Sequence, residues 1–157
     1  QWQDININIK LIPSVEKFKH NYIKIMRPPK TKLFGINDRQ GLRLLTRLRV
    51  DFSDLRQHRY NHHFNCLNAT CRCLTENETS EHFLIRCPRF SLHRFTLFGN
   101  IAPVAPDIIV LTDDQLSSIL LFGSPTFNDI TNKIILTSTI HFIKITGRFN
   151  KIEAYTQ

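Results

Sequence analysis

The amino-acid sequence predicts a mostly α fold, a small helical domain organised around one loop. In several segments apolar residues recur three and four positions apart, which is the spacing of one face of a helix. Residues that stop helices, such as Pro28 and Gly123, follow these segments. Between them, three cysteines and a histidine crowd into the stretch CRCLTENETSEHFLIRCPRF, residues 71–90. A chain of 157 residues, 41% of them hydrophobic, is long enough to bury a core.

Two helices are predicted in the first third of the chain. The first follows Ser14, a suitable N-cap, and ends at RPPK; its apolar face is Val15, Phe18, Tyr22, Ile25 and Met26. After the connector KTKLFGIND, the segment GLRLLTRLRV predicts the second helix. Its leucines Leu44, Leu45 and Leu48 share one face, and three arginines spaced four apart form a stripe on another: Arg39, Arg43 and Arg47.

Four further helices are predicted downstream. Ser53 is expected to cap a short helix in SDLRQHRYNHHF, and Pro88 to begin one that buries Phe90, Leu92, Phe95 and Leu97. Thr112 and Gln115 match a capping box before an apolar run that ends at Phe122 and Gly123. The last helix, from about Asn128 to Arg148, buries Ile130, Ile134, Ile135, Thr139, Phe142 and Ile143, although its β-branched residues leave a strand as an alternative.

These elements suggest three segments. Residues 1–64 form a helical basic segment, residues 65–98 contain the cysteine–histidine loop and the helix after it, and residues 99–157 form a C-terminal helical hairpin. The only methionine is Met26, so we expect the chain to be a piece of a longer polypeptide. No signal peptide and no apolar run of membrane-spanning length, roughly 18 residues, is apparent.

Positive charge is concentrated in one part of the chain. The net charge is +8, and the segment from Lys24 to His63 holds ten Lys or Arg against three Asp. Such a patch is the electrostatic footprint expected of a protein that binds nucleic acid, although a solvated basic surface remains an alternative. The candidate backbone contacts are Arg39, Arg43, Arg47, Arg49, Arg56 and Arg59, with Tyr60 or Phe64 as a stacking surface for single strands.

The cysteine–histidine stretch has the spacing of a structural zinc site. Its ligand set is Cys71, Cys73, His82 and Cys87, two close pairs joined by a short loop. Because His82 and Cys87 are five apart, we expect a distorted or short helix between them. Four protein ligands leave no position open for water, so a catalytic zinc is disfavoured. The cofactor predicted from these residues is Zn²⁺.

Disulfide bonding is the main alternative. The four cysteines are an even number with Cys66 included, and Asn68 and Asn77 each begin a glycosylation acceptor pattern. Disulfides, however, would give His82 no role, and a chain of this size does not need them. Cys66 could also replace His82 as a ligand.

Other charged and histidine side chains near the cluster have two readings. Arg72, Arg86 and Arg89 could balance the negative charge of a thiolate site or contact phosphate. His58, His62 and His63 lack enough clustered partners for a second metal site, and are expected to be surface or packing residues.

With these residues in place, the chain resembles the C-terminal region of reverse transcriptases from non-LTR (LINE-like) retrotransposons, which carries a CCHC zinc-binding finger. The matching motifs are Cys-x-Cys, Glu78-Thr79, His82-Phe-Leu and Cys87-Pro88, preceded by LLTRLR and LRQHRYNHHF. LLFGS and HFIKITGRF resemble the closing helices, and further matches are Trp2, Phe18, Lys19, Arg27 and Pro28. Two positions depart from the family: Leu74 stands where a glycine usually follows the second cysteine, and Ala69 replaces a usual proline.

The resemblance implies a non-catalytic accessory module that contacts template RNA or target DNA, beside the upstream reverse transcriptase domain. It implies a location in a nuclear or cytoplasmic ribonucleoprotein particle, and no membrane. Polymerase activity is not expected, because the adjacent pair Asp113 and Asp114 is explained by the capping box. The alternative is a structural or protein-interaction zinc module that docks on the polymerase domain or an acidic partner.

Overall fold

The computed structural model describes residues 35–150, and this part of the chain is mostly helical. The helix predicted after Ser14 lies outside the described residues. The α-helices are α2 (Arg39–Arg49), α3 (Arg56–Asn61), α4 (Ser91–Ile101), α5 (Asp113–Phe122) and α6 (Asp129–Ile145). Three shorter turns connect them: the π-helix η2 (His82–Arg86) and the 3₁₀-helices η3 (Pro88–Phe90) and η4 (Pro106–Val110). Between residues 35 and 150, β pairing is limited to one isolated bridge from Thr70 to Asn77.

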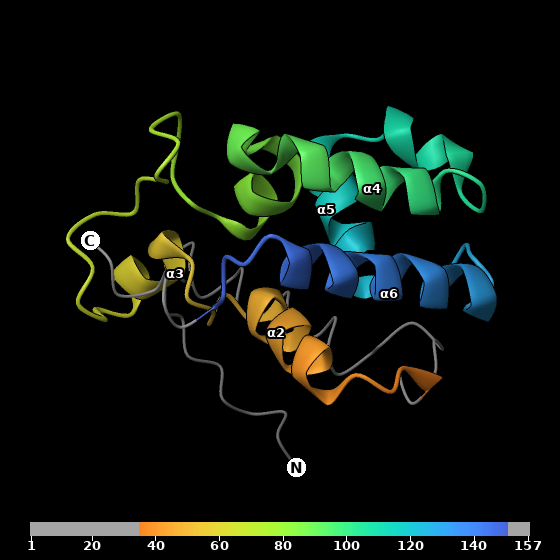
Figure 1. Cartoon of the computed structure of the whole chain (residues 1–157), viewed down its shortest axis with the longest axis horizontal. Helices are drawn as coiled ribbons and strands as arrows, with labels where there is room; N and C mark the ends of the chain where they lie inside the picture. The colour runs from red at the N-terminus through yellow and green to blue at the C-terminus, as the bar shows by residue number, and fades with distance from the viewer. Residues whose placement is uncertain (1–34, 151–157) are drawn as a thin grey trace, which may run out of the picture.

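Helix α6 is the centre of the fold, with α2, α4 and α5 packed against it (Figure 1). Asn128 begins it by accepting a hydrogen bond from the Thr131 backbone N–H, so the strand alternative for this segment is wrong. Its buried face includes Ile135, Thr139 and Phe142 as predicted. Ile130 is instead 73% exposed, because Thr131 and Asn132 are the buried residues in the first turn of the helix.

Helices α2 and α6 approach closely at Gly41. A Cβ atom at this position would lie 2.2 Å from Ile140 Cγ2, so only glycine permits the contact. Asp38 caps α2 by accepting a hydrogen bond from the Gly41 N–H at 2.8 Å, and Lys144 Nζ of α6 lies 2.9 Å from the same carboxylate. The cap and the ion pair fix the start of α2 against the end of α6.

Helix α3 is shorter than predicted, and Ser53 is not its N-cap. The helix begins at Arg56, with Leu55 in the cap position. The Ser53 hydroxyl lies 2.8 Å from His58 Nδ1 and accepts from the Leu55 N–H, so it organises the turn before the helix.

Helix α4 also differs from its prediction. Phe90 and Leu97 are buried, but Leu92 and Phe95 are 82% and 83% exposed. The buried face of α4 is formed by Arg94, Leu97 and Ile101, three and four positions apart, which turns the other two side chains outward.

Helix α5 follows its predicted signals. Thr112 and Gln115 form the capping box, and Gly123 ends the helix with a φ of 73°. A Cβ on Gly123 would lie 2.5 Å from Asn132 Oδ1, which adds a steric reason for glycine. The acidic pair at the start of α5 is thus accounted for: it follows the cap, and Asp113 pairs with Arg86.

The three predicted segments share one hydrophobic core within residues 35–150. Leu45 and Leu48 come from the first, Phe83 from the second, and Ile135 and Phe142 from the third. Phe83 lies at the junction, with its ring centroid 5.4 Å from that of Phe142. Among the helices described, none is both long and apolar enough to cross a bilayer.

Candidate metal centre and basic surface

The four predicted ligands meet at one place. The ligand atoms of Cys71, Cys73, His82 and Cys87 all lie within 4.8 Å of one another, so the group could hold a metal ion. The Sγ atoms of Cys71 and Cys87 are 3.7 Å apart, and Cys73 Sγ is 3.2 Å from His82 Nε2. Two thiolates bound to one tetrahedral metal at about 2.3 Å stand about 3.8 Å apart. The spacing therefore fits a tetrahedral site with three sulfur ligands and one nitrogen.

A tight turn presents the first pair of cysteines. The Leu74 N–H donates to the Cys71 carbonyl, and the Cys71 N–H donates to the Glu76 carbonyl, both at 2.9 Å. Leu74 adopts a φ of 65°, the left-handed region that leucine disfavours. The turn thus requires the backbone conformation that a glycine would provide without strain, and the leucine side chain is left 82% exposed.

A π-helix presents the second pair. The Cys87 N–H donates to the His82 carbonyl at 2.7 Å, the five-residue bond that defines this helix type. A turn of this width brings side chains five apart onto nearly the same face. The expectation of a distorted or short helix here is confirmed, and both ligands are buried.

Burial and hydrogen bonding give the thiols different acidities. Burial raises the pKa of Cys71 to about 12 and also raises that of Cys87. Burial acts in the same direction on Cys73, but hydrogen bonds involving Thr75 outweigh it and lower the pKa of Cys73 to about 6. Burial thus opposes the thiolate forms of Cys71 and Cys87, which are the forms that would bind a metal.

Glu76 touches the far side of the histidine ligand, a contact that the sequence reasoning missed. Its Oε1 lies 2.8 Å from His82 Nδ1, while His82 Nε2 faces Cys73. Arg86 holds the carboxylate with two contacts, Nε to Oε1 at 2.9 Å and Nη2 to Oε2 at 2.7 Å. These bonds from Arg86 lower the pKa of Glu76 to about 2. A carboxylate this close to Nδ1 favours a proton on that nitrogen, which leaves Nε2 free to bind a metal.

The arginines near the ligands divide between several roles. Arg86 pairs with Glu76, Glu81 and Asp113. It thereby joins residues 71–87, which we call the metal loop, to the start of α5. Arg89 lies over the Phe90 ring, 5.5 Å from its centroid. Arg94, not singled out in the sequence, is buried and donates to the backbone carbonyls of Phe83 and Cys87.

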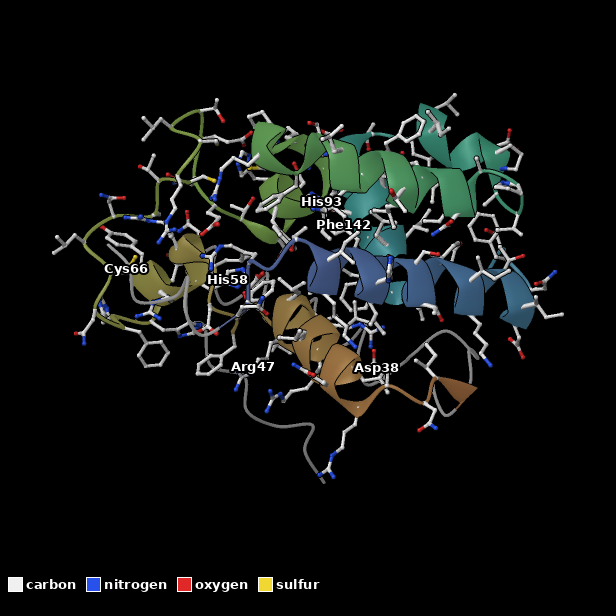
Figure 2. The ribbon with its side chains drawn as sticks, viewed as in Figure 1. Asp38, Arg47, His58, Cys66, His93 and Phe142 are labelled. Carbon is white, nitrogen blue, oxygen red and sulfur yellow. The ribbon has the colours of Figure 1, made fainter. Side chains whose placement is uncertain are left out.

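Cys66 lies outside the ligand cluster, in the segment after α3 (Figure 2). Its Sγ is 3.0 Å from the Asn68 carbonyl, and it does not substitute for His82. All four cysteines are free thiols, and the 3.7 Å between Cys71 and Cys87 is well beyond the roughly 2.05 Å of a disulfide. The disulfide alternative is therefore not realised.

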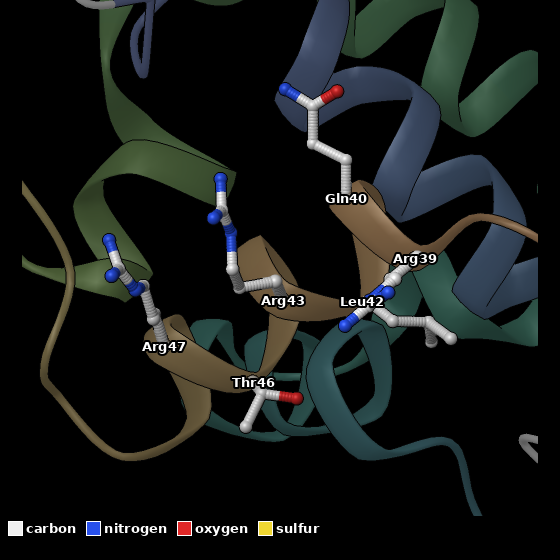
Figure 3. Close-up of a pocket in the computed structure, with 6 residues that line it drawn as sticks. All are labelled: Arg39, Gln40, Leu42, Arg43, Thr46 and Arg47. Carbon is white, nitrogen blue, oxygen red and sulfur yellow. The ribbon is translucent and has the colours of Figure 1, made fainter.

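The three stripe arginines lie on the outer face of α2. Arg39, Arg43 and Arg47 are exposed, and within residues 35–150 no carboxylate forms an ion pair with them. Together with Gln40, Leu42 and Thr46 they line an open groove of about 790 Å³ (Figure 3). Arg43 and Arg47 extend to the same side of the helix in that view. We call Arg39, Arg43 and Arg47 the arginine face.

The other predicted nucleic-acid contacts are not part of this face. Arg49 is only 6% exposed, because its Nε donates to the Leu121 carbonyl at 2.6 Å and its guanidinium lies over Phe122. Arg56 is half-buried and reaches Asn68, and Arg59 pairs with Asp54 at 3.8 Å. Tyr60 is 48% exposed. Arg49 thus serves the core, and Arg56 and Arg59 are partly engaged.

The histidines upstream do not form a second metal cluster among the described residues. His58 is buried: Nδ1 accepts from the Ser53 N–H, and Nε2 lies 3.0 Å from Asp51 Oδ1. His62 and His63 are exposed. Their interpretation as packing and surface residues is confirmed.

A site with four protein ligands has no open coordination position, so it can stabilise a loop but cannot present a bound water. Comparisons with protein-family models, with curated proteins and with solved structures found no match for this chain.

Proposed function

We propose that this chain is a zinc-stabilised, nucleic-acid-binding accessory module of a non-LTR retrotransposon reverse transcriptase, contacting template RNA or target DNA. The observation that supports this proposal most is the exposed arginine face on α2, a helix that the metal loop contacts by a hydrogen bond. The short sequence motifs around the four proposed ligands support the assignment to this family. The module would carry no polymerase activity of its own.

Zinc is the metal that the donor set favours. Three thiolates and one imidazole are soft to intermediate ligands, and their tetrahedral spacing suits Zn²⁺ more than the oxygen-seeking Mg²⁺ or Ca²⁺. Zinc binding would stabilise the thiolate forms of the two buried residues Cys71 and Cys87 and release their protons. In this proposal the metal has a structural role and drives folding of the loop.

The loop contacts α2 and α3, the helices of the basic segment that the structure describes. The Ser80 hydroxyl donates to the Leu48 carbonyl in the last turn of α2, at 3.3 Å. At the start of α3, Glu78 accepts from the Arg56 N–H through its carboxylate, and the Glu78 carbonyl accepts from the Gln57 N–H. A metal that fixes residues 71–87 therefore also fixes where the arginine face is presented.

The arginine face would bind phosphates. The three arginines are spaced about one helical turn apart, so they place positive charge along α2. Arginine binds phosphate oxygens through two donors at once. Neutralising phosphates releases counterions, so each contact adds somewhat less than one unit to the dependence of log Kd on log salt.

The test is a salt titration of binding to a single-stranded RNA and to a duplex DNA. The triple variant Arg39→Gln/Arg43→Gln/Arg47→Gln should weaken binding and reduce the salt slope by about two units. The matched controls are Lys133→Gln and Arg89→Gln, which remove exposed positive charge elsewhere. If the triple variant binds like the parent chain, or the parent binds neither ligand, the proposed function is wrong.

The second candidate is a protein-docking module, and the exposed side chains of α4 favour it. Leu92 and Phe95 are solvent-facing by more than four-fifths, an unusual position for large apolar groups. A docking role predicts that Leu92→Ser/Phe95→Ser abolishes co-purification with the upstream polymerase domain and leaves RNA affinity unchanged. Co-purification that survives the double change would exclude this surface.

A further inference from the structure

Three rings gather on the surface where α2 ends. The ring centroids of Phe52 and His62 are 4.8 Å apart, those of Phe52 and Phe64 are 5.6 Å apart, and those of His62 and Phe64 are 5.9 Å apart. The rings of His62 and Phe64 are stacked, at 30° to each other, while Phe52 meets both edge-on. We call these three residues the aromatic platform.

Backbone bonds attach the platform to the end of the arginine face. The Phe52 N–H donates to the carbonyl of Arg47 at 2.9 Å. His62 Nε2 lies 3.2 Å from the Asp51 carbonyl, which ties the end of α3 to the same turn. The Phe64 N–H donates to the Arg59 carbonyl, helped by a left-handed φ of 56° at His63. The rings therefore follow Arg47 in space although two of them lie beyond α3 in sequence.

The platform is not part of the core. Phe52 and Phe64 are each 48% exposed, and His62 is exposed as well. None of the three belongs to the buried cluster within residues 35–150. The ordered arrangement of half-exposed rings keeps apolar surface in water, which a ligand with flat apolar faces would cover.

The charges around the platform favour an anionic ligand. Arg47 lies on one side, and on the other Arg59 Nη2 donates to the Phe64 carbonyl at 3.2 Å. The neighbouring carboxylates are already engaged: Asp51 Oδ1 lies 3.0 Å from His58 Nε2, and Asp54 pairs with Arg59. A phosphate chain would thus meet Arg47 beside the rings, and Arg59 more weakly, because Arg59 shares its charge with Asp54.

We propose that the platform makes this surface selective for single-stranded nucleic acid. Unpaired bases would stack on Phe52, His62 and Phe64, while the connected phosphates follow the arginine face along α2. A duplex cannot use the rings, because its base faces are stacked inside. The inference rests on the proposed function and adds the strand state that the surface recognises.

The experiment measures binding of the zinc-loaded chain to three fluorescent probes, of which the single strand and the abasic strand carry equal charge. These are a 12-nucleotide single strand, the same strand in a duplex, and a 12-unit abasic sugar–phosphate strand. The parent chain should bind the single strand about tenfold or more tightly than the abasic strand, since stacking strengthens binding substantially per base. RNA and DNA versions of the single strand show whether the sugar matters.

The platform variant is Phe52→Leu/Phe64→Leu, which keeps apolar side chains but removes the rings. It should lose about tenfold in affinity for the base-bearing strand and none for the abasic strand. The control is Phe95→Leu, which removes a more exposed ring from α4 and should bind like the parent. Unchanged zinc content and thermal unfolding of each variant show that the fold is retained.

Two results separate this inference from the proposed function. If the parent binds the abasic strand and the duplex as tightly as the single strand, the platform has no role in recognition, although the arginine face still binds phosphate. That comparison needs no variant, so it decides the matter even if the platform variant does not fold. If the arginine variant loses binding to all three probes while the platform variant binds all three like the parent, the proposed function stands and this inference is wrong.

Discussion

Arg148 donates two hydrogen bonds to Glu78, Nε to Oε1 at 2.6 Å and Nη2 to Oε2 at 2.7 Å. Both side chains are buried, 7% and 1% exposed. Burial opposes the charge on Glu78, but the bonds from Arg148 outweigh it and hold the pKa of Glu78 below its ordinary value. The same guanidinium reaches the Asp54 carbonyl. The pair ties the turn after α6 to the metal loop and to the turn before α3.

Breaking this pair should be costly, because one buried charge would remain without its partner. We expect Arg148→Met to lower the free energy of unfolding by about 3 kcal/mol. The double change Glu78→Gln/Arg148→Met should recover a large part of that loss, since it removes both charges. Urea denaturation of the zinc-loaded proteins measures both values; equal losses in the single and double variants would contradict the account.

Asp38 gives a pH-dependent prediction far from the metal loop. The Gly41 N–H and then Lys144 hold the pKa of Asp38 below its ordinary 3.8. A carboxyl with a lowered pKa stabilises the fold above its unfolded pKa, and the stabilisation is lost as pH falls through the folded value. Asp38→Ala should cost about 1 kcal/mol at neutral pH, as for other N-caps. Urea denaturation should give the same cost from pH 8 to 5 and a smaller one only near pH 4 and below.

Replacing Leu74 with glycine should stabilise the fold. Its left-handed backbone costs a leucine about 1 kcal/mol, and the exposed side chain contributes little packing. Leu74→Gly is therefore expected to raise the free energy of unfolding by about 1 kcal/mol and to keep zinc affinity. Leu92→Gly is the control: it is equally exposed but helical, and should lose about 1 kcal/mol. A loss of stability in both variants would refute the strain at Leu74.

Glu76 should strengthen metal binding through His82. Removing the charge that orients a ligating histidine typically lowers metal affinity 10–100-fold. Glu76→Gln should show a loss within about this range in competition with a colorimetric zinc chelator. Glu81→Gln is the matched control, because Glu81 also contacts Arg86 but is not the carboxylate at His82 Nδ1. Equal zinc affinities in the two variants would mean that Glu76 supports only Arg86.

Local signals in the sequence predicted most of the described helices. The arginine spacing placed α2, Thr112 and Gln115 marked the start of α5, and Gly123 marked its end. The clustering of Cys71, Cys73, His82 and Cys87 was predicted from their spacing, and so was the irregular helix between His82 and Cys87. Such features depend on residues close in sequence, so a local sequence pattern can predict them.

The features that the sequence did not predict depend on contacts between residues far apart in the chain. Helical spacing could not show that α4 packs through Arg94 and turns Phe95 outward, because that choice depends on where α6 lies. Nor could composition show that Arg49 is buried against Leu121, seventy-two positions away. The aromatic platform likewise arises because turns bring Phe52 beside His62 and Phe64.

The most direct test of the central claim is the metal content of the purified chain, followed while the metal is removed. We expect one zinc per chain in the parent and in Cys66→Ser, and none in Cys87→Ser. Removal by a chelator should abolish the cooperative thermal unfolding transition and, with it, salt-dependent RNA binding. A metal-free chain that keeps the same unfolding transition and RNA affinity, or zinc lost on changing Cys66, would contradict the account.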